Sequence, residues 1–250
     1  MNVLAIGNSF SQDATHYLRQ IALADGDDWR VMNLYIGGCS LERHWRNIES
    51  GAEDYLCEIN GASTEKYVSI QQALDMGPWD VIVTQQASHD SGLMETYQPY
   101  LSKMVGYLRE HTPKAELLLQ ETWAYEIDSL HEKFHRYDHS QQKMYAALSA
   151  CYQKAAEETG LRLIPCGDVI QALRGRAPFR YEEGGMSICR DGFHMNVIYG
   201  RYLLAAVWYR TLTERSVREN TYVPSTPLAP GAVCNPQVLA VVKDVVDEMA

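Results

Sequence analysis

The stretch Val3-Leu4-Ala5-Ile6-Gly7-Asn8-Ser9-Phe10-Ser11 lies almost at the start of the sequence and decides the fold. Its four consecutive apolar residues predict a buried strand, and the Gly-Asn-Ser that follows predicts a tight turn. A helical pattern begins at Asp13. Open α/β sheets bind their ligands at the carboxyl ends of their strands. Ser9 would lie at that edge, and it is the candidate nucleophile.

Further apolar runs predict strands farther along the chain, with helical patterns between them. These strands are expected at 30–36, 80–84, 116–120 and 161–165. Strands that alternate with helices favour βαβ units, a parallel sheet and right-handed crossovers. We therefore expect an α/β fold with about five parallel strands and helices on both faces of the sheet.

Two segments depart from this alternation. Asn60-Gly61 lies between apolar runs and predicts a β-hairpin, inserted as an excursion at about 51–70. A Pro-rich connection and a last helix are expected over 222–250. No internal repeat is visible, so residues 1–250 are expected to form one domain.

The composition restricts the class of protein. A chain of 250 residues that is 46% hydrophobic suits one full core. A net charge of -10 argues against a nucleic-acid partner. No apolar run approaches the roughly 18 residues of a membrane span, and the absence of a signal-peptide pattern favours the cytoplasm. The six cysteines form no C-x-x-C pair and are expected to be free thiols.

A second motif near the end of the sequence supplies partners for a serine nucleophile. Acyl transfer by serine needs a base, a group that orients the base, and donors for the oxyanion. In Asp191-Gly192-Phe193-His194, the Asp191 carboxylate can hold Nδ1 of His194 and leave Nε2 to face Ser9. The Ser9 amide, the Gly38 amide and the Gln86 side chain are the candidate oxyanion donors, because each follows a different predicted strand.

These blocks, in this order, resemble the SGNH (GDSL-type) hydrolases over roughly residues 1 to 212. The resemblance implies a flavodoxin-like, three-layer α/β/α sandwich. It also implies that Ser9 is the nucleophile, His194 the base and Asp191 its orienter, with Gly38 and Gln86 in the oxyanion hole. The expected activity is a serine esterase that needs no metal or cofactor and removes a small acyl group, such as acetyl, from a small-molecule or carbohydrate ester.

Two departures from the usual SGNH pattern affect these expectations. Gly7-Asn8-Ser9 replaces the usual Gly-Asp-Ser, which leaves the nucleophile in place. The block from Gln85 to Asp90 replaces Gly-x-Asn-Asp and looks more like the Gln-Gly-Glu block of carbohydrate acetylesterases. Gln85 and His89 are therefore rivals of Gln86 for the oxyanion. The Gln-Gln-x-Ser block and the Thr-Trp-Ala-Tyr segment at 122–125 also resemble uncharacterised bacterial SGNH-like proteins.

Aromatic residues after the fourth strand suggest how a substrate is held. Trp123 and Tyr125 are expected near Ser9, either as a stacking platform for a sugar or as a packing cluster within the loop. His89, on the neighbouring loop, is a further candidate substrate contact.

Two other functions remain open. His131-Glu132-Lys133-Phe134-His135 matches the H-E-x-x-H signature of zinc hydrolases. However, the segment is polar on every side, unlike a zinc helix packed into a core. The third possibility is a non-catalytic glycan-binding domain on the same fold.

Overall fold

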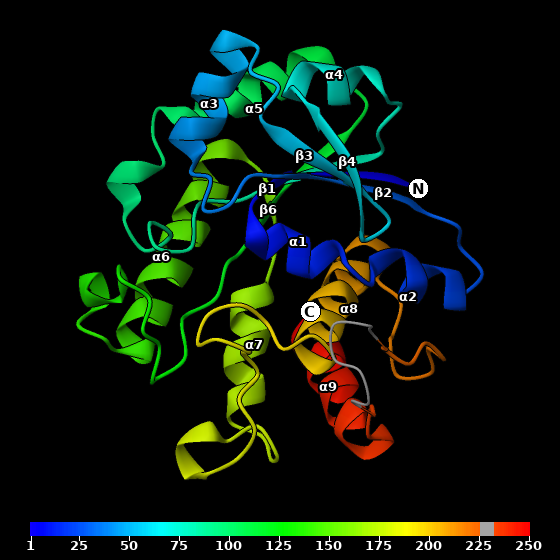
Figure 1. Cartoon of the computed structure of the whole chain (residues 1–250), viewed down its shortest axis with the longest axis vertical. Coiled ribbons are helices and arrows are strands. Elements are labelled where there is room, and N and C mark those ends of the chain that lie inside the picture. The colour runs from blue at the N-terminus through cyan, green and yellow to red at the C-terminus, as the bar shows by residue number, and fades with distance from the viewer. Residues whose placement is uncertain (226–232) are drawn as a thin grey trace.

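The computed structural model describes residues 1–225 and 233–250. Its centre is a seven-stranded sheet with the order β4-β3-β2-β1-β5-β6-β7 (Figure 1). The strands are β1 (Asn2–Gly7), β2 (Arg30–Tyr35), β3 (Tyr55–Ile59), β4 (Ala62–Val68), β5 (Val81–Thr84), β6 (Glu116–Gln120) and β7 (Arg162–Ile164). The five predicted strands are β2, β1, β5, β6 and β7, and all their pairings are parallel.

The predicted hairpin is part of the main sheet. Its strand β3 pairs antiparallel with β2, and β4 then forms the edge. Asn60 and Gly61 both have positive φ, at 54° and 81°, as the tight two-residue turn requires. The α/β fold class is confirmed, but the hairpin enlarges the sheet from five strands to seven.

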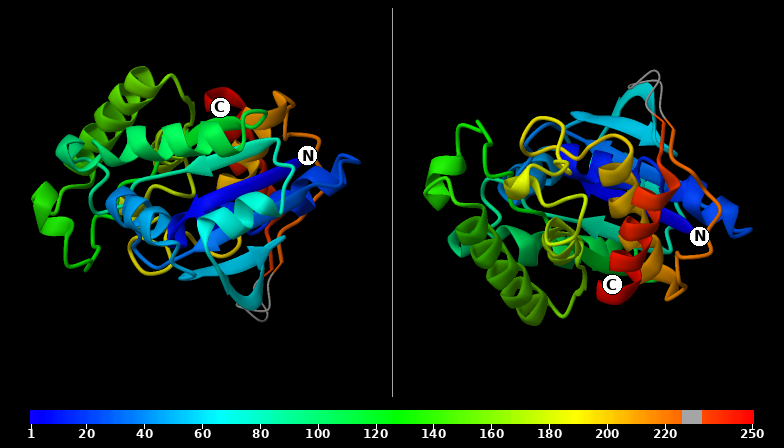
Figure 2. Two further views of the ribbon diagram at one scale, coloured as in Figure 1. Left: turned by 90° about the horizontal axis from the view of Figure 1, so that it is seen from above. Right: turned by 90° about the horizontal axis from the view of Figure 1, so that it is seen from below.

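Helices cover both faces of the sheet. One face carries α3 (Leu41–Ser50), α4 (Ile70–Asp75) and α5 (Tyr100–His111); the other carries α1 (Ser9–Thr15), α2 (Leu18–Ala24), α7 (Cys166–Arg174), α8 (Tyr199–Thr213) and α9 (Pro236–Met249). In Figure 2, α4 and α5 lie over the sheet when it is seen from above, and α8 and α9 when it is seen from below. The remaining helix, α6 (Gln141–Thr159), packs against α7 and β7.

Burial explains why β1 occupies the middle of the sheet. The side chains from Val3 to Ile6 are 0% exposed, because helices cover them on both sides. The larger ones, Val3, Leu4 and Ile6, each stabilise the fold by about 1.5–3 kcal/mol. Beneath the sheet, α8 is buried along most of its length, from Tyr199 to Tyr209, and contacts α1, α2, α7 and α9.

Further predictions can be compared with the structure. All six cysteines are free and buried, as expected. The helix expected from Asp13 begins earlier, at Ser9, and it is interrupted at His16 and Tyr17, where α1 ends and α2 begins. Part of the Pro-rich connection lies outside the described residues. No helix in the described ranges is both long and apolar enough to cross a membrane.

Candidate active site at the carboxyl edge of the sheet

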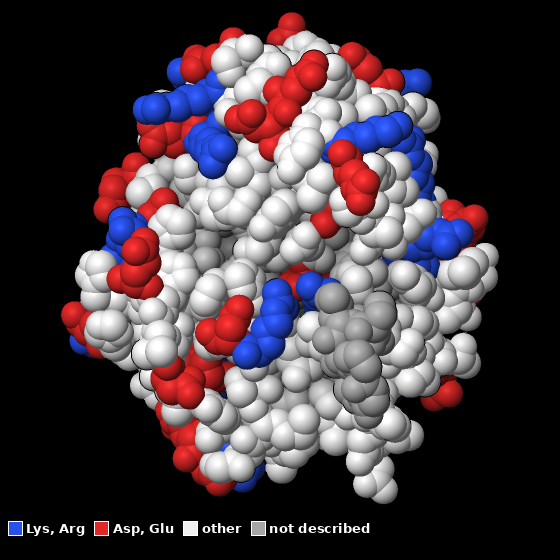
Figure 3. Space-filling view, viewed as in Figure 1, with Lys and Arg blue, Asp and Glu red and all other residues white. Residues whose placement is uncertain are grey.

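Ser9 is the first residue of α1, directly beyond the central strand. The turn before it needs a glycine, because a Cβ on Gly7 would lie 2.4 Å from Ser11 Oγ. Asn8 caps the helix, and its Oδ1 accepts a hydrogen bond from the Phe10 amide at 3.0 Å. Ser9 is half-buried, and its Oγ makes no hydrogen bond within the described chain. A hollow lies just beyond this end of α1 in Figure 3.

Asn8 also joins the ends of three neighbouring strands. Its Nδ2 donates to the Cys39 carbonyl, after β2, at 3.0 Å. Its Oδ1 accepts from Gln85 Nε2, after β5, at 2.7 Å. These bonds orient the amide unambiguously, since Oδ1 receives two donors and Nδ2 faces a carbonyl. Asn8 therefore fixes the turn that carries Ser9 to the loops on both sides.

The residues from Ile188 to Asn196 form a narrow hairpin, which we call the histidine hairpin. Cys189 and Met195 form an antiparallel bridge at its base. The Asn196 amide donates to the Ile188 carbonyl at 2.7 Å, and the Arg190 amide donates to the His194 carbonyl at 2.9 Å. The Asp191-to-His194 motif lies at the tip, where Gly192 turns the chain with φ of +87°.

Within the tip, Asp191 holds His194 in two ways. Its Oδ2 lies 2.7 Å from His194 Nδ1, and its Oδ1 accepts the His194 amide at 2.8 Å. Burial alone would raise the pKa of Asp191, but the hydrogen bonds from His194 outweigh it and lower that pKa. The carboxylate therefore stays charged and leaves Nε2 as the ring nitrogen that points away from Asp191.

The histidine hairpin brings His194 to the start of α1. The ring centroids of His194 and Phe10 are 6.2 Å apart, and Phe10 is the residue after Ser9. No hydrogen bond of the described chain joins Ser9 Oγ to His194. Catalytic hydrogen bonds in ligand-free enzymes are often long and shorten when substrate binds.

The Gln86 side chain, predicted as an oxyanion donor, makes four hydrogen bonds within the described chain. It is 1% exposed, and its Oε1 accepts the amides of Leu41 at 2.9 Å and Ala87 at 2.8 Å. Its Nε2 donates to both the carbonyl and the Oγ1 of Thr96, each at 3.0 Å. Both amide hydrogens are used, so Gln86 fastens the start of α3 to the loop that follows β5.

This role gives a prediction for Gln86→Leu. The change leaves the buried amide of Leu41 without an acceptor and the Thr96 acceptors without a donor. The free energy of unfolding should fall by roughly 2–4 kcal/mol, while kcat for an ester substrate should stay within about tenfold. Urea unfolding and steady-state kinetics measure the two quantities. A loss of about 10²–10³ in kcat at unchanged stability, as an oxyanion donor would give, contradicts the assignment.

Two of the predicted oxyanion donors, the backbone amides of Ser9 and Gly38, remain free to donate. Neither the Ser9 amide nor the Gly38 amide makes a hydrogen bond within the described chain. Gly38 is exposed and has φ of +60°, a conformation that favours glycine. The bond from Asn8 to the Cys39 carbonyl anchors the next residue of that loop. Of the predicted oxyanion donors, these two amides are therefore available to a ligand.

The rivals of Gln86 differ in position. Gln85 is 1% exposed, and it uses Nε2 to bind Asn8. His89 is half-buried and stacks on His131, with ring centroids 6.0 Å apart. Burial lowers the pKa of both imidazoles, so these rings are neutral near pH 7. Through His131, which also contacts Phe193, His89 packs toward the histidine hairpin.

Trp123 and Tyr125 are buried, and as the structure stands they offer no face to a sugar. Both are 0% exposed. The Trp123 ring stacks on Phe10 at 3.8 Å, and its Nε1 donates to the Phe193 carbonyl at 2.7 Å. The Tyr125 hydroxyl lies 2.8 Å from Ser88 Oγ. Of the two predicted alternatives, this burial favours the packing cluster, which supports the histidine hairpin.

The H-E-x-x-H segment does not form a zinc helix. Only a short 3-10 turn, η2 (Phe134–Tyr137), is present there. His131 packs against Tyr125, and its Nδ1 accepts the Lys133 amide at 3.1 Å, whereas His135 is exposed. No group of His, Cys, Asp or Glu in the described ranges is arranged to hold a metal ion. This geometry disfavours the alternative zinc chemistry.

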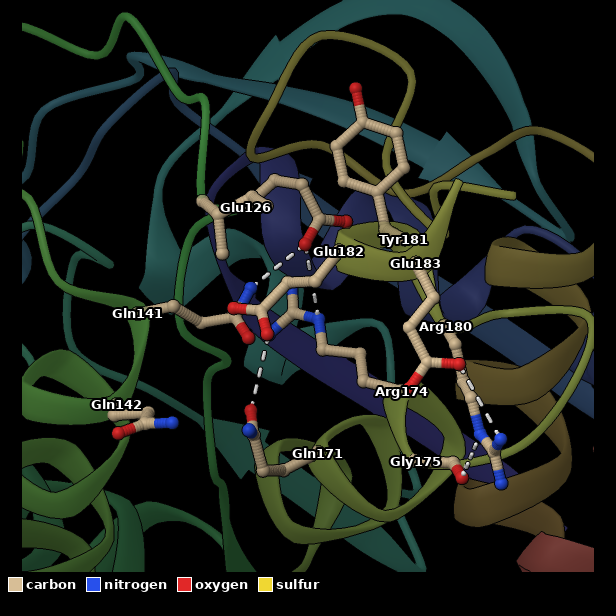
Figure 4. A pocket seen from close by; sticks show the side chains of 11 residues that line it. Glu126, Gln141, Gln142, Gln171, Arg174, Gly175, Arg180, Tyr181, Glu182 and Glu183 are labelled. Atoms are coloured by element: carbon tan, nitrogen blue, oxygen red, sulfur yellow. Dashed lines mark hydrogen bonds and ion pairs between the residues drawn. The ribbon is translucent and has the colours of Figure 1, made fainter. Parts of the chain in front are cut away.

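A polar cavity of about 530 Å³ lies between α6, α7 and the 3-10 turn η3 (Tyr181–Glu183), as Figure 4 shows. At its inner wall, Arg174 Nε is 3.6 Å from Glu126 Oε1, and Gln141 donates to the same oxygen at 2.8 Å. The amide of Glu126 donates to the Gly192 carbonyl at 2.7 Å. The cavity wall therefore supports the tip of the histidine hairpin, although neither Ser9 nor His194 lines the cavity.

The comparisons with known proteins agree with this fold. A structure of a DUF4886 family protein from Bacteroides uniformis is 36% identical, with a TM-score of 0.90 over 99% of this chain and 93% of that one. An acetylxylan esterase from Geobacillus stearothermophilus has a TM-score of 0.57 at 14% identity, over 85% of this chain and 94% of that one. A lipase/acylhydrolase from Enterococcus faecalis has a TM-score of 0.55 at 16% identity, over 86% and 97%.

The last two likenesses show a shared fold, which is the fold that the sequence motifs predicted. No curated protein matches the chain. The family model described as a domain of unknown function, DUF4886, matches residues 2–232. With that match and the 36% identity over nearly its whole length, the chain belongs to the DUF4886 family.

Proposed function

We propose that this protein is a serine esterase in which Ser9 attacks a small acyl ester. The observation that carries the proposal is the Asp191–His194 pair, bonded at 2.7 Å and held beside the helix start that bears Ser9. The same three residue types, arranged as nucleophile, base and orienter, perform acyl transfer on several unrelated folds.

The mechanism uses this chain's own groups at each step. His194 Nε2 takes the proton of Ser9 Oγ as that oxygen bonds to the ester carbonyl, and Asp191 stabilises the resulting imidazolium. The free amides of Ser9 and Gly38 receive the oxyanion. His194 then returns the proton to the departing alcohol. In the second half, His194 takes a proton from the attacking water and passes it to Ser9 Oγ as the bond between that oxygen and the acyl group breaks and the acid leaves.

Acetylated carbohydrate is the substrate class that we propose. An acetylxylan esterase is among the proteins that share the fold. The charge distribution fits a neutral substrate, since basic side chains on the face in Figure 3 are scattered among acidic ones. A small acyl group also suits a nucleophile that is itself half-buried.

The proposal is tested by labelling and by a substrate panel. We expect a fluorophosphonate probe to modify Ser9, as located by mass spectrometry of the labelled peptide. We also expect kcat/KM for p-nitrophenyl acetate to exceed that for the octanoate ester by at least about tenfold, and acetylated xylooligosaccharides to release acetate. Activity that survives the probe but disappears with a chelator would instead indicate the zinc hydrolase.

A non-catalytic glycan-binding domain is the second candidate. The free Ser9 Oγ and the polar cavity in Figure 4 favour it. It would show no labelling and no hydrolysis of any ester in the panel, yet it would bind an oligosaccharide in calorimetry.

A further inference from the structure

The base of the histidine hairpin is held by a buried carboxylate that the proposed mechanism does not use. Asp13 lies on α1 and is 0% exposed. Its two oxygens lie 3.1 and 3.0 Å from a terminal nitrogen of Arg190, and Oδ2 also accepts the Met195 amide at 2.9 Å. Arg190 precedes the Asp191-to-His194 motif and Met195 follows it, so Asp13 binds both legs of the hairpin.

A second arginine completes this arrangement. Arg201, on α8, donates from Nε to Asp13 Oδ1 at 2.8 Å, and its side chain is only 7% exposed. Charge-assisted hydrogen bonds of this kind are about twice as strong as neutral ones. The Asp13 carboxylate therefore has its hydrogen-bonding capacity filled by two cations and one amide, which fixes its position.

The place of Asp13 on α1 relates it to the nucleophile. Residues four apart lie on the same face of a helix, and Asp13 is four residues after Ser9. Among the described residues of α1, Asp13 alone makes side-chain hydrogen bonds to the histidine hairpin. Other hydrogen bonds to the hairpin include those from Trp123 Nε1 and the Glu126 amide, on the loop after β6, and from the Arg201 amide to the Asn196 carbonyl.

We propose that Asp13 is a positioning residue that sets the distance and orientation of His194 relative to Ser9, by fixing the histidine hairpin to the nucleophile's own helix. The inference rests on the proposed function. Because one short helix carries both Ser9 and Asp13, a movement of α1 carries the base along with the nucleophile. Loss of the carboxylate would leave Arg190 and Arg201 without their common partner and would free both legs of the hairpin.

The test compares Asp13→Asn with Glu58→Gln. Asparagine keeps an oxygen for the Met195 amide but loses the charge that holds both arginines. Misplacement of a catalytic group by about 1 Å costs roughly 10²-fold, so kcat for p-nitrophenyl acetate should fall about 10²-fold with KM within about threefold. Glu58 is the matched control: it is also a buried carboxylate tied to α1, through Gln12 Nε2 at 2.6 Å, but it does not touch the hairpin. Its variant should keep kcat within about twofold.

A measurement that does not depend on activity separates the inference from the proposed function. The amides of Arg190 and Asn196 close the hairpin and should exchange their hydrogens at least about tenfold faster in Asp13→Asn, with exchange in β1 unchanged. If Asp13→Asn does not fold, Arg190→Gln replaces it, because the Arg190 side chain is partly exposed. This variant should show the same faster exchange and a kcat loss of about tenfold.

The outcomes are distinct. Unchanged exchange and unchanged kcat in a folded variant overturn the positioning role of Asp13. A uniform rise in exchange across the whole sheet also overturns it, because that result indicates general destabilisation. In a third outcome, exchange becomes faster in the hairpin alone, while the wild-type protein neither hydrolyses esters nor reacts with the probe. This result would support the role of Asp13 in fixing the histidine hairpin and would refute the esterase.

Discussion

Ser9→Ala is expected to lower kcat for p-nitrophenyl acetate by at least about 10⁴-fold while leaving the protein folded. The loss is large because no acyl-enzyme can form without Oγ, and the oxyanion donors alone give only residual rates. Stability should change by less than about 0.5 kcal/mol, because Ser9 Oγ makes no hydrogen bond within the described chain. Steady-state kinetics and thermal unfolding measure the two quantities.

Ser40→Ala is the matched control for this experiment. Ser40 lies at the same edge of the sheet and caps α3, where its Oγ accepts the Arg43 amide at 3.3 Å. Its removal should cost about 1 kcal/mol of stability and leave kcat within about threefold. If Ser9→Ala retains kcat while Ser40→Ala loses it, the nucleophile has been wrongly assigned.

Asn8→Asp is expected to lower the free energy of unfolding by about 2–3 kcal/mol. The Asn8 Nδ2 donates to the Cys39 carbonyl, and an aspartate would place a charged oxygen against that carbonyl oxygen. The loop that holds Gly38 would lose its anchor, so kcat should also fall by about tenfold. Urea unfolding at neutral pH measures the first effect. The loss of unfolding free energy should be smaller at acidic pH, because a protonated carboxyl group at position 8 can again donate a hydrogen bond to the Cys39 carbonyl.

Asn60→Asp separates this local effect from the general effect of adding a negative charge. The Asn60 side chain accepts the Val31 amide at 3.0 Å, a bond that aspartate can also make. Asp-Gly also suits the tight hairpin turn. We expect a change below about 0.5 kcal/mol. Equal losses in Asn8→Asp and Asn60→Asp would show that the hydrogen bond to Cys39 is not what makes asparagine necessary at position 8.

The features that the sequence predicted correctly are those set by local patterns. Val3 to Ile6 are apolar because helices cover both faces of β1, and the Asn60–Gly61 turn follows from two residues that tolerate positive φ. Helix α4 was not predicted, although Ser69 and Gln72 form a capping box at its start. Its six residues are too few to show a helical period.

The direction of a side chain could not be predicted in the same way. Gln86 follows the expected strand, but its side chain binds Leu41, at the start of α3, and Thr96, on the loop after β5. The strand pattern does not indicate either partner. Trp123, expected near Ser9, stacks on Phe10, the next residue, and close packing buries its ring. Asp13 binds Arg190 and Arg201, which lie 177 and 188 residues away in the sequence. The only local indication of its role is its position four residues after Ser9, a spacing that places two residues on the same face of a helix.

The ion pair between α1 and α8 also bears on when the site can form. Asp13 lies on α1, and Arg201 lies on α8, 188 residues farther along the chain. A contact between residues so far apart in the sequence closes a long loop, and the entropy cost of closure rises with loop length. During synthesis, the strands from β1 to β7 emerge before α8 does, so the early chain contains Ser9 without an ordered base. On the proposed mechanism, the activity would therefore start only when the carboxyl-terminal quarter of the chain docks.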